Sequence, residues 1–150
     1  MKFFDLRSIL LARHAQHIVL VHFPIALLVA SVVFDLLSRW TGRQQFATAG
    51  KFNLYGAALT APLAALTGIA AWQLQLEGAR LKGALLLHLC AAAIVLILIW
   101  GLAWFRLRRG ADSVAPLPLA FHAAGLCAAL AVAATAHLGG FVSGVVTLGG

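Results

Sequence analysis

The stretch HIVLVHFPIALLVASVVFDLL, residues 17–37, opens with two histidines and then stays apolar almost to its end. A transmembrane helix needs about 20 predominantly apolar residues, and this stretch has that length. Three further runs of similar character follow, so we expect membrane spans over about residues 17–37, 53–74, 83–104 and 118–140. Four spans joined by short loops pack as an antiparallel bundle. The expected fold is therefore an all-α membrane protein, an antiparallel four-helix transmembrane bundle.

The composition excludes an ordinary soluble domain. Hydrophobic residues make up 63% of the chain and charged residues 10%, whereas soluble domains are about 45–50% apolar and about 25% charged. The net charge of +7 arises from Lys and Arg in short segments between the apolar runs. Such residues set membrane topology and contact anionic lipids, so we do not expect nucleic-acid binding. Cys90 and Cys127 lie inside apolar runs without a CxxC pattern, which gives no support to a disulfide or c-type haem attachment.

The two ends of the chain differ from the spans. Residues 1–16 mix apolar and charged side chains, which predicts a short amphipathic helix lying in the membrane interface. Residues 141–150 form an apolar, Gly-rich tail whose conformation the sequence does not assign. The loops after the first and third spans hold six Lys and Arg residues against five on the opposite side. Because cytoplasmic loops carry the excess of positive charge, this pattern orients both termini to the outside.

Two local sequence patterns concern an ion pair and an internal repeat. Asp35 precedes Arg39 by four residues, a spacing that favours an ion pair within one helix. Val21-His22-x3-Ala26 in the first span also aligns with Leu87-His88-x3-Ala92 in the third. Two hairpins related by an axis along the membrane normal would produce this alignment, and so would chance in Ala- and Leu-rich helices.

Histidines recur at one calculated depth of the bundle. At about 1.5 Å per residue, His22 and His88 lie about five residues inside their spans, and His137 lies about three residues from the end of the fourth. Gly68 of the second span reaches the same level, and His17 lies one to two turns nearer the surface. Ionisable residues at membrane depth usually face the bundle interior and have a function. The sequence therefore predicts a histidine layer.

Such a layer suits a b-type haem, which needs two axial histidines between apolar walls, with small residues where the porphyrin passes. The candidate axial ligands are His22, His88 and His137, with His17 next in line, and Gly68 supplies the small residue. In one alternative the same three histidines bind copper or zinc. In another the protein is a structural anchor whose histidines only hydrogen-bond neighbouring helices. His17 and His22 lie about 140° apart around the helix, which disfavours a compact site containing both.

His122 stands apart from this layer, fifteen residues before His137 on the same span. We interpret it as an interfacial hydrogen-bond donor, with a proton-handling or quinone head-group site as the alternative. A nucleophilic enzyme is not indicated, because no Ser or Cys has a plausible base and orienting acid near it.

The motif His17-x4-His22-Phe-Pro-Ile-Ala-Leu-Leu, followed by Phe34-Asp35-Leu-Leu, resembles a bacterial four-span membrane family known as a domain of unknown function. The resemblance covers essentially the whole chain: the glycine of the second span corresponds to Gly68, the early histidine of the third to His88, and a late Leu-Gly-Gly to residues 138–140. Ile18 departs from the pattern, since proline often follows the first histidine in the family. The resemblance supports the fold and singles out His17 and His22. It also implies a bacterial inner (cytoplasmic) membrane protein that acts beside respiratory or periplasmic redox proteins. In such a membrane the charge pattern places both termini in the periplasm.

The leading hypothesis is a membrane-embedded electron-transfer subunit that holds haem b and links the quinone pool to an extracytoplasmic redox partner. The expected partners are the lipid bilayer, quinone, and other subunits of a redox complex or a c-type cytochrome. We expect a non-catalytic subunit of such a complex rather than an enzyme in its own right.

Overall fold

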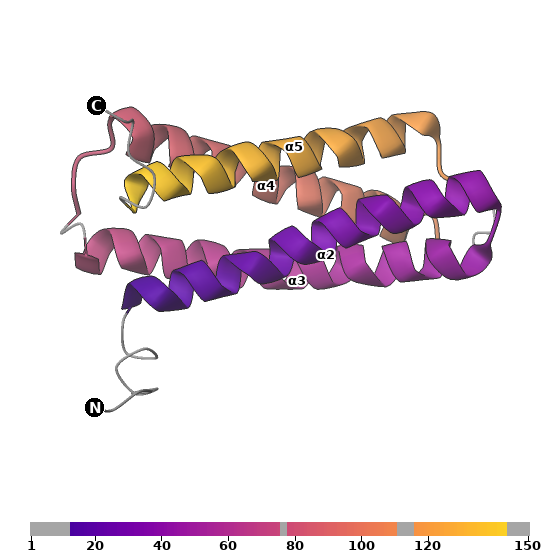
Figure 1. Ribbon diagram of the computed structural model, residues 1–150, viewed down its shortest axis with the longest axis horizontal. Helices are drawn as coiled ribbons and strands as arrows, with labels where there is room; N and C mark the ends of the chain where they lie inside the picture. Colours follow the sequence, from indigo (N-terminus) through magenta and orange to yellow (C-terminus); the bar gives the residue numbers. More distant parts are fainter. Residues whose placement is uncertain (1–12, 76–77, 111–115, 144–150) are drawn as a thin grey trace, which may run out of the picture.

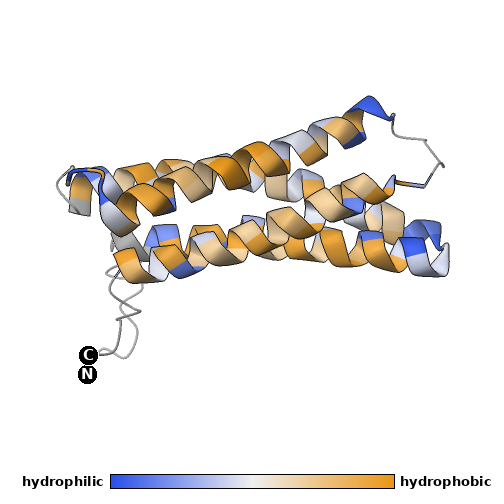
Figure 2. Ribbon diagram, turned by 90° about the horizontal axis from the view of Figure 1, so that it is seen from above, coloured by the Kyte–Doolittle hydropathy of each residue, from blue (hydrophilic) through white to orange (hydrophobic). Residues whose placement is uncertain are grey.

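The computed structural model describes residues 13–75, 78–110 and 116–143, and these form four long helices. They are α2 (Arg13–Thr41), α3 (Gln44–Gln75), α4 (Gly83–Arg108) and α5 (Leu119–Val142). Each of the four is long and apolar enough to cross a membrane. Figure 2 shows the same division, with apolar residues along the helices and polar residues gathered towards their ends. The predicted all-α, four-span bundle is confirmed.

The helices extend beyond the predicted spans. The largest difference is in α3, which begins at Gln44 rather than near residue 53. Hydropathy identifies only the part of a helix that matches the hydrocarbon core, whereas the helix itself continues into the more polar membrane interface. The interfacial helix predicted over residues 1–16 falls mostly outside the described residues, and its described part, from residue 13, belongs to α2. Of the predicted tail, residues 144–150 also lie outside the described part, while α5 continues to Val142.

A tight turn joins α2 to α3 into a hairpin. Gly42 adopts a positive φ of 68°, a conformation that glycine accepts readily at the end of a helix, and its N–H donates to Ser38 O at 2.8 Å. Helices α4 and α5 form the second antiparallel hairpin, and the two hairpins lie one above the other in Figure 1. Helix α2 lies beside α3 and α5, and α4 lies beside the same two helices. Helices α2 and α4 are therefore diagonally opposite.

Each helix has a seam of buried residues that recur at intervals of three and four, which is the spacing of an interior-facing stripe. The seams are Pro24, Leu28, Ser31 and Asp35 in α2; Gly50, Leu54, Ala57 and Ala61 in α3; Val95, Ile99, Leu102 and Arg106 in α4; Phe121, Gly125, Ala128 and Val132 in α5. Adding 71 to each position in the first hairpin gives the corresponding buried position in the second. The two hairpins are thus structural repeats.

The repeat differs in register from the predicted one. The sequence alignment paired His22 with His88, but the buried seams pair His17 with His88. The predicted alignment was wrong because it followed similar letters in Ala- and Leu-rich segments, whereas the phase of each helix is set by the residues that it buries. Five residues rotate a helix by about 140°, so the two registers place different faces in the interior.

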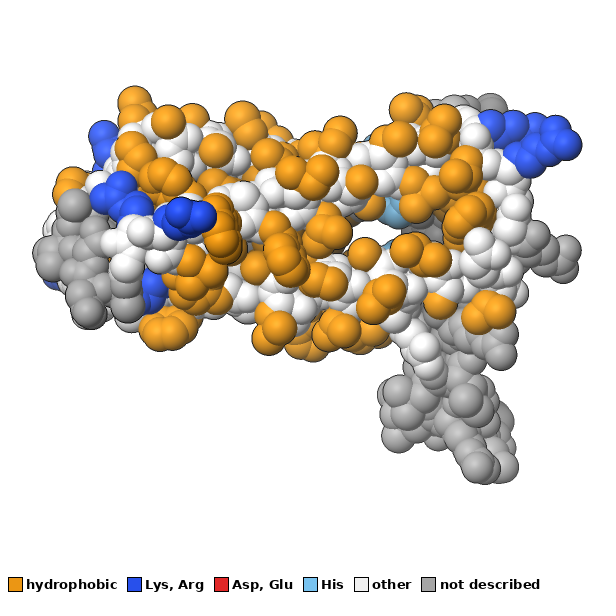
Figure 3. Space-filling model, turned by 180° about the vertical axis from the view of Figure 1, so that it is seen from behind, with side chains coloured by type: hydrophobic (Ala, Val, Ile, Leu, Met, Phe, Trp, Pro, Cys, Tyr) orange, Lys and Arg blue, Asp and Glu red, His pale blue; other side chains and the backbone are white. Residues whose placement is uncertain are grey.

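The buried residues fill only one half of the bundle. Among the described residues, the buried positions fall within 24–35, 50–64, 95–106 and 121–132, all towards the end that contains the Gly42 turn. No described residue in 16–23, 65–74, 83–94 or 133–143 is buried. Figure 3 shows an opening between the two hairpins in this second half, with histidine side chains at its edges. The hairpins therefore pack closely at one end and leave space between them at the other.

Candidate functional site

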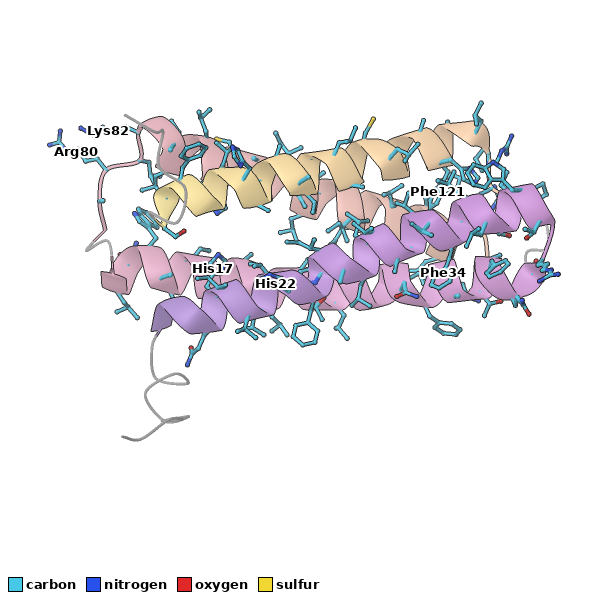
Figure 4. The ribbon with its side chains drawn as sticks, in the orientation of Figure 1. His17, His22, Phe34, Arg80, Lys82 and Phe121 are labelled. Atoms are coloured by element: carbon cyan, nitrogen blue, oxygen red, sulfur yellow. The ribbon has the colours of Figure 1, made fainter. Side chains whose placement is uncertain are left out.

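His17 and His88 extend the interior seams into the open half. His17 precedes Pro24 by seven residues, and His88 precedes Val95 by seven. Residues seven apart lie on nearly the same face of a helix, so both histidines are in line with the buried seams of α2 and α4. Both side chains are half-buried, and Figure 4 places His17 near the start of α2, at the end of the bundle where Arg80 and Lys82 lie. Two diagonally opposite helices thus bring one imidazole each to the open half.

A glycine on the neighbouring helix faces each of these imidazoles. A Cβ added at Gly68 of α3 would lie 3.0 Å from His17 Cε1, and one added at Gly139 of α5 would lie 3.1 Å from His88 Cε1. The bare backbone at these positions lets helix and imidazole approach closely, as small residues do in membrane bundles. Gly68 and Gly139 are also equivalent in the 71-residue repeat. We call these four residues the histidine–glycine layer.

The hydrogen bonds of His17 and His88 define which ring nitrogen carries the proton. His88 Nδ1 lies 3.0 Å from Thr135 O, and because a carbonyl oxygen only accepts, Nδ1–H is the donor. His17 Nδ1 lies 3.2 Å from Thr67 Oγ1, whose own proton is donated to Ala64 O at 2.9 Å. Because this hydroxyl proton is already donated, we assign His17 Nδ1–H as the donor and Thr67 Oγ1 as the acceptor. In the neutral form of both rings the lone pair is on Nε2, the usual arrangement in a histidine that ligates a metal.

His22 and His137 have different surroundings. Both are exposed. His22 Nδ1–H donates to Ile18 O of its own helix, and the His137 ring packs edge-on against Phe141 at a centroid distance of 4.8 Å. Equal depth had placed these two histidines in one layer with His88, but depth does not define the face of the helix on which a residue lies. The structure brings His17 to Gly68 and His88 to Gly139, and it leaves His22 and His137 off the interior seams.

The packed half contains a buried ion pair between the two hairpins. Arg106 Nη2 of α4 donates to Asp35 Oδ1 of α2 at 2.6 Å, and both side chains are buried. The predicted partner Arg39 is instead exposed, so the predicted i,i+4 pair was wrong. Asp35 lies on the interior seam, where it faces the other hairpin rather than the next turn of its own helix. The dipeptides Phe34-Asp35 and Phe105-Arg106, 71 residues apart, were the sequence signal for this contact.

Small and polar groups allow this ion pair to form. A Cβ at Gly50 of α3 would overlap Asp35 Oδ1, so only glycine leaves room for the carboxylate. Ser31 Oγ donates to Gly50 O at 2.8 Å and ties α2 to α3 one turn away. His122 of α5 is buried nearby, and its Nδ1–H donates to Pro118 O at 3.0 Å. His122 was predicted to be an interfacial hydrogen-bond donor; it does donate a hydrogen bond, and its side chain is buried.

The predicted copper or zinc site lacks a cluster of ligands. Among residues 13–75, 78–110 and 116–143, no group of three His, Cys, Asp or Glu side chains is arranged to hold a metal ion. Cys90 and Cys127 are both exposed and unbridged. The described residues instead present two imidazole–glycine pairs, His17 with Gly68 and His88 with Gly139.

Comparison with known proteins identifies a family to which the chain is similar over most of its length. The family model described as "Predicted membrane protein (DUF2231)" matches residues 13–149. No curated protein and no solved structure matches the chain. The match agrees with the resemblance in the first-span motif and covers nearly the whole chain.

Proposed function

The chain belongs to the DUF2231 family of predicted membrane proteins, and we propose that this member is a b-type haem electron-transfer subunit with His17 and His88 as the axial ligands. One observation carries the proposal. The two histidines occupy equivalent positions on the interior seams of diagonally opposite helices, at the open half of the bundle. A six-coordinate haem needs one imidazole on each of its two faces, and two facing helices supply them.

Three further features support haem in this position. Because Gly68 and Gly139 have no side chain, each imidazole lies against the neighbouring helix of its own hairpin, and the opening between the two hairpins is left for a porphyrin (Figure 3). Nδ1 of each histidine is held by a hydrogen bond that orients the ring and leaves the lone pair on Nε2. The walls of this half are built from apolar helices, and an apolar shell with low solvent access is one of the means by which proteins tune haem potentials.

The position of the layer suggests how electrons reach and leave the haem. His88 is five residues into α4, or about 8 Å along the helix axis at about 1.5 Å per residue. Arg80 and Lys82 project from the same end of the bundle (Figure 4). A haem near this end is close to one aqueous face, where positive charges favour the approach of an acidic redox partner such as a c-type cytochrome. Quinol in the bilayer is the proposed electron source.

The proposal also orients the protein. Helix α2 begins, and α5 ends, at the end of the bundle that holds the histidine–glycine layer (Figure 1). An extracytoplasmic electron partner requires this end to face the periplasm of a bacterial inner membrane. Fusions at the C-terminus test the orientation, because alkaline phosphatase is active only when exported. An inactive phosphatase fusion together with a fluorescent cytoplasmic reporter would reverse it.

An optical spectrum of the detergent-purified protein tests the function. The protein is produced with an adequate haem supply, and we expect a reduced α-band and a pyridine haemochrome at one haem per chain. His17→Ala and His88→Ala should each lose this haem while remaining monodisperse by gel filtration. Retention of a full haem complement by either variant would contradict the assignment of that ligand.

Two outcomes would point to the alternatives. Absence of haem together with one equivalent of copper or zinc by elemental analysis would favour a metal-binding membrane protein. Absence of both would favour a structural anchor, in which the histidines only link neighbouring helices.

A further inference from the structure

The hydroxyl of Thr67 lies between His17 and the backbone of α3. It accepts from His17 Nδ1–H at 3.2 Å and donates to Ala64 O at 2.9 Å. The side chain is half-buried, so water competes less for these bonds than it would at an exposed surface. Thr67 is thus a two-bond link that fixes the orientation of one imidazole of the histidine–glycine layer.

The second hairpin makes the corresponding contact without this link. His88 Nδ1–H donates directly to Thr135 O at 3.0 Å. In the 71-residue repeat, Thr135 corresponds to Ala64, and Leu138 stands where Thr67 would be. Equivalent backbone carbonyls, Ala64 O and Thr135 O, are therefore the final acceptors in the two hairpins. Only in the first hairpin does a hydroxyl lie between the imidazole and this carbonyl. The two imidazoles have different hydrogen-bond acceptors although their positions are equivalent.

We propose that Thr67 is a positioning residue that orients and polarises His17 as an axial ligand and so sets the midpoint potential of the haem. The inference rests on the proposed function. A hydrogen bond from Nδ1–H increases the basicity of Nε2, and a more basic axial ligand stabilises the oxidised iron. A hydroxyl that is already donating to a carbonyl is polarised and accepts more strongly. Thr67 therefore lowers the potential, and it does so through a side chain that substitution can remove, unlike the carbonyl that serves His88.

Thr67→Val tests this inference because valine keeps the shape of threonine and lacks the hydroxyl. We expect the variant to bind haem and its midpoint potential, measured by spectroelectrochemical titration, to rise. Thr67→Ser retains a hydroxyl and should restore the wild-type potential. The matched control is Thr60→Val on the same helix, since Thr60 Oγ1 donates to Gly56 O of its own helix at 2.8 Å. Its potential should not change.

The possible outcomes separate the inference from the proposed function. A haem-loaded Thr67→Val with an unchanged potential would overturn the inference alone, as would an equal rise in Thr60→Val. If Thr67→Val loses its haem, recovery in Thr67→Ser supports the positioning role, and loss from both variants overturns it. A wild-type protein that binds no haem overturns the proposed function itself.

Discussion

Asp35 and Arg106 stand 71 residues apart in the chain, at equivalent positions of two repeated hairpins, and form an ion pair of 2.6 Å across the bundle. Equivalent positions on diagonally opposite helices face one another, so identical charges there would repel. The opposite charges instead join the two repeats. His17 and His88 are related by the same separation at the other end of the same seams. One end of the repeat is thus closed by an ion pair, and the other presents two imidazoles.

The ion pair should be essential to the stability of the bundle. Removing one partner leaves a buried charge without compensation, which costs about 3–5 kcal/mol. We expect Arg106→Met to lower the free energy of unfolding by about that amount, measured by denaturant unfolding in mixed micelles. The charge-swapped double variant, Asp35→Arg with Arg106→Asp, should recover part of the loss because it restores a pair of opposite charges between α2 and α4. Arg108→Met is the control, since Arg108 is exposed. Equal losses in Arg108→Met and Arg106→Met would contradict a specific role for the pair.

Gly50 should tolerate no side chain. A Cβ there would overlap Asp35 Oδ1 and lie 3.2 Å from Ser31 O, so Gly50→Ala must displace either the ion pair or the α2 backbone. Overpacking of this kind costs about 1–3 kcal/mol. The comparison is Gly101→Ala in α4, where nothing lies within 4 Å of the added Cβ, and where alanine favours the helix. Thermal unfolding followed by gel filtration should separate the two variants. Similar stabilities would show that the helices adjust without cost at Gly50.

The sequence predicted the fold well because its main determinant is hydropathy. Four apolar runs indicated four spans, and the spans are confirmed. The same pattern carried little information about helix phase, since the apolar residues of α3, α4 and α5 are spread around each helix and do not distinguish one face from another. Glycine positions supplied part of the missing information: Gly68 was recognised as a small residue at the layer, but its contact with His17 became visible only in three dimensions.

Helix phase also explains which site predictions changed. Counting depth along each span placed His22 and His137 level with His88, and depth alone could not reveal that they are exposed. Thr67 was not identified, because a threonine in an apolar run is commonly bonded to its own helix, as Thr60 is. Asp35 was assigned to Arg39 because local spacing is readable from sequence, whereas a contact over 71 residues requires the repeat register. The 71-residue register would have identified both His17 and Arg106.

The exposed histidines should be dispensable for the cofactor. His22 and His137 lie off the interior seams, and their rings interact with Ile18 O and Phe141 of their own helices. We expect His22→Ala and His137→Ala to retain the reduced α-band and the haem stoichiometry of the wild type. If either variant loses its haem while His17→Ala keeps it, the ligands belong to the layer predicted from depth along the spans, and His17 is not one of them.

Side chains added at the glycines of the layer should weaken cofactor binding in both hairpins. Gly68→Ala brings a Cβ to 3.0 Å from His17 Cε1, and Gly139→Ala brings one to 3.1 Å from His88 Cε1, so each imidazole must shift away from its neighbouring helix. Crowding of about 1–3 kcal/mol corresponds to haem binding that is weaker by roughly fivefold to a hundredfold. Haem titration of the apo-protein measures the affinity, with Gly101→Ala as the control. Because the two sites are equivalent, both variants should be affected. A loss confined to one of them would mean that only one imidazole of the pair ligates the haem.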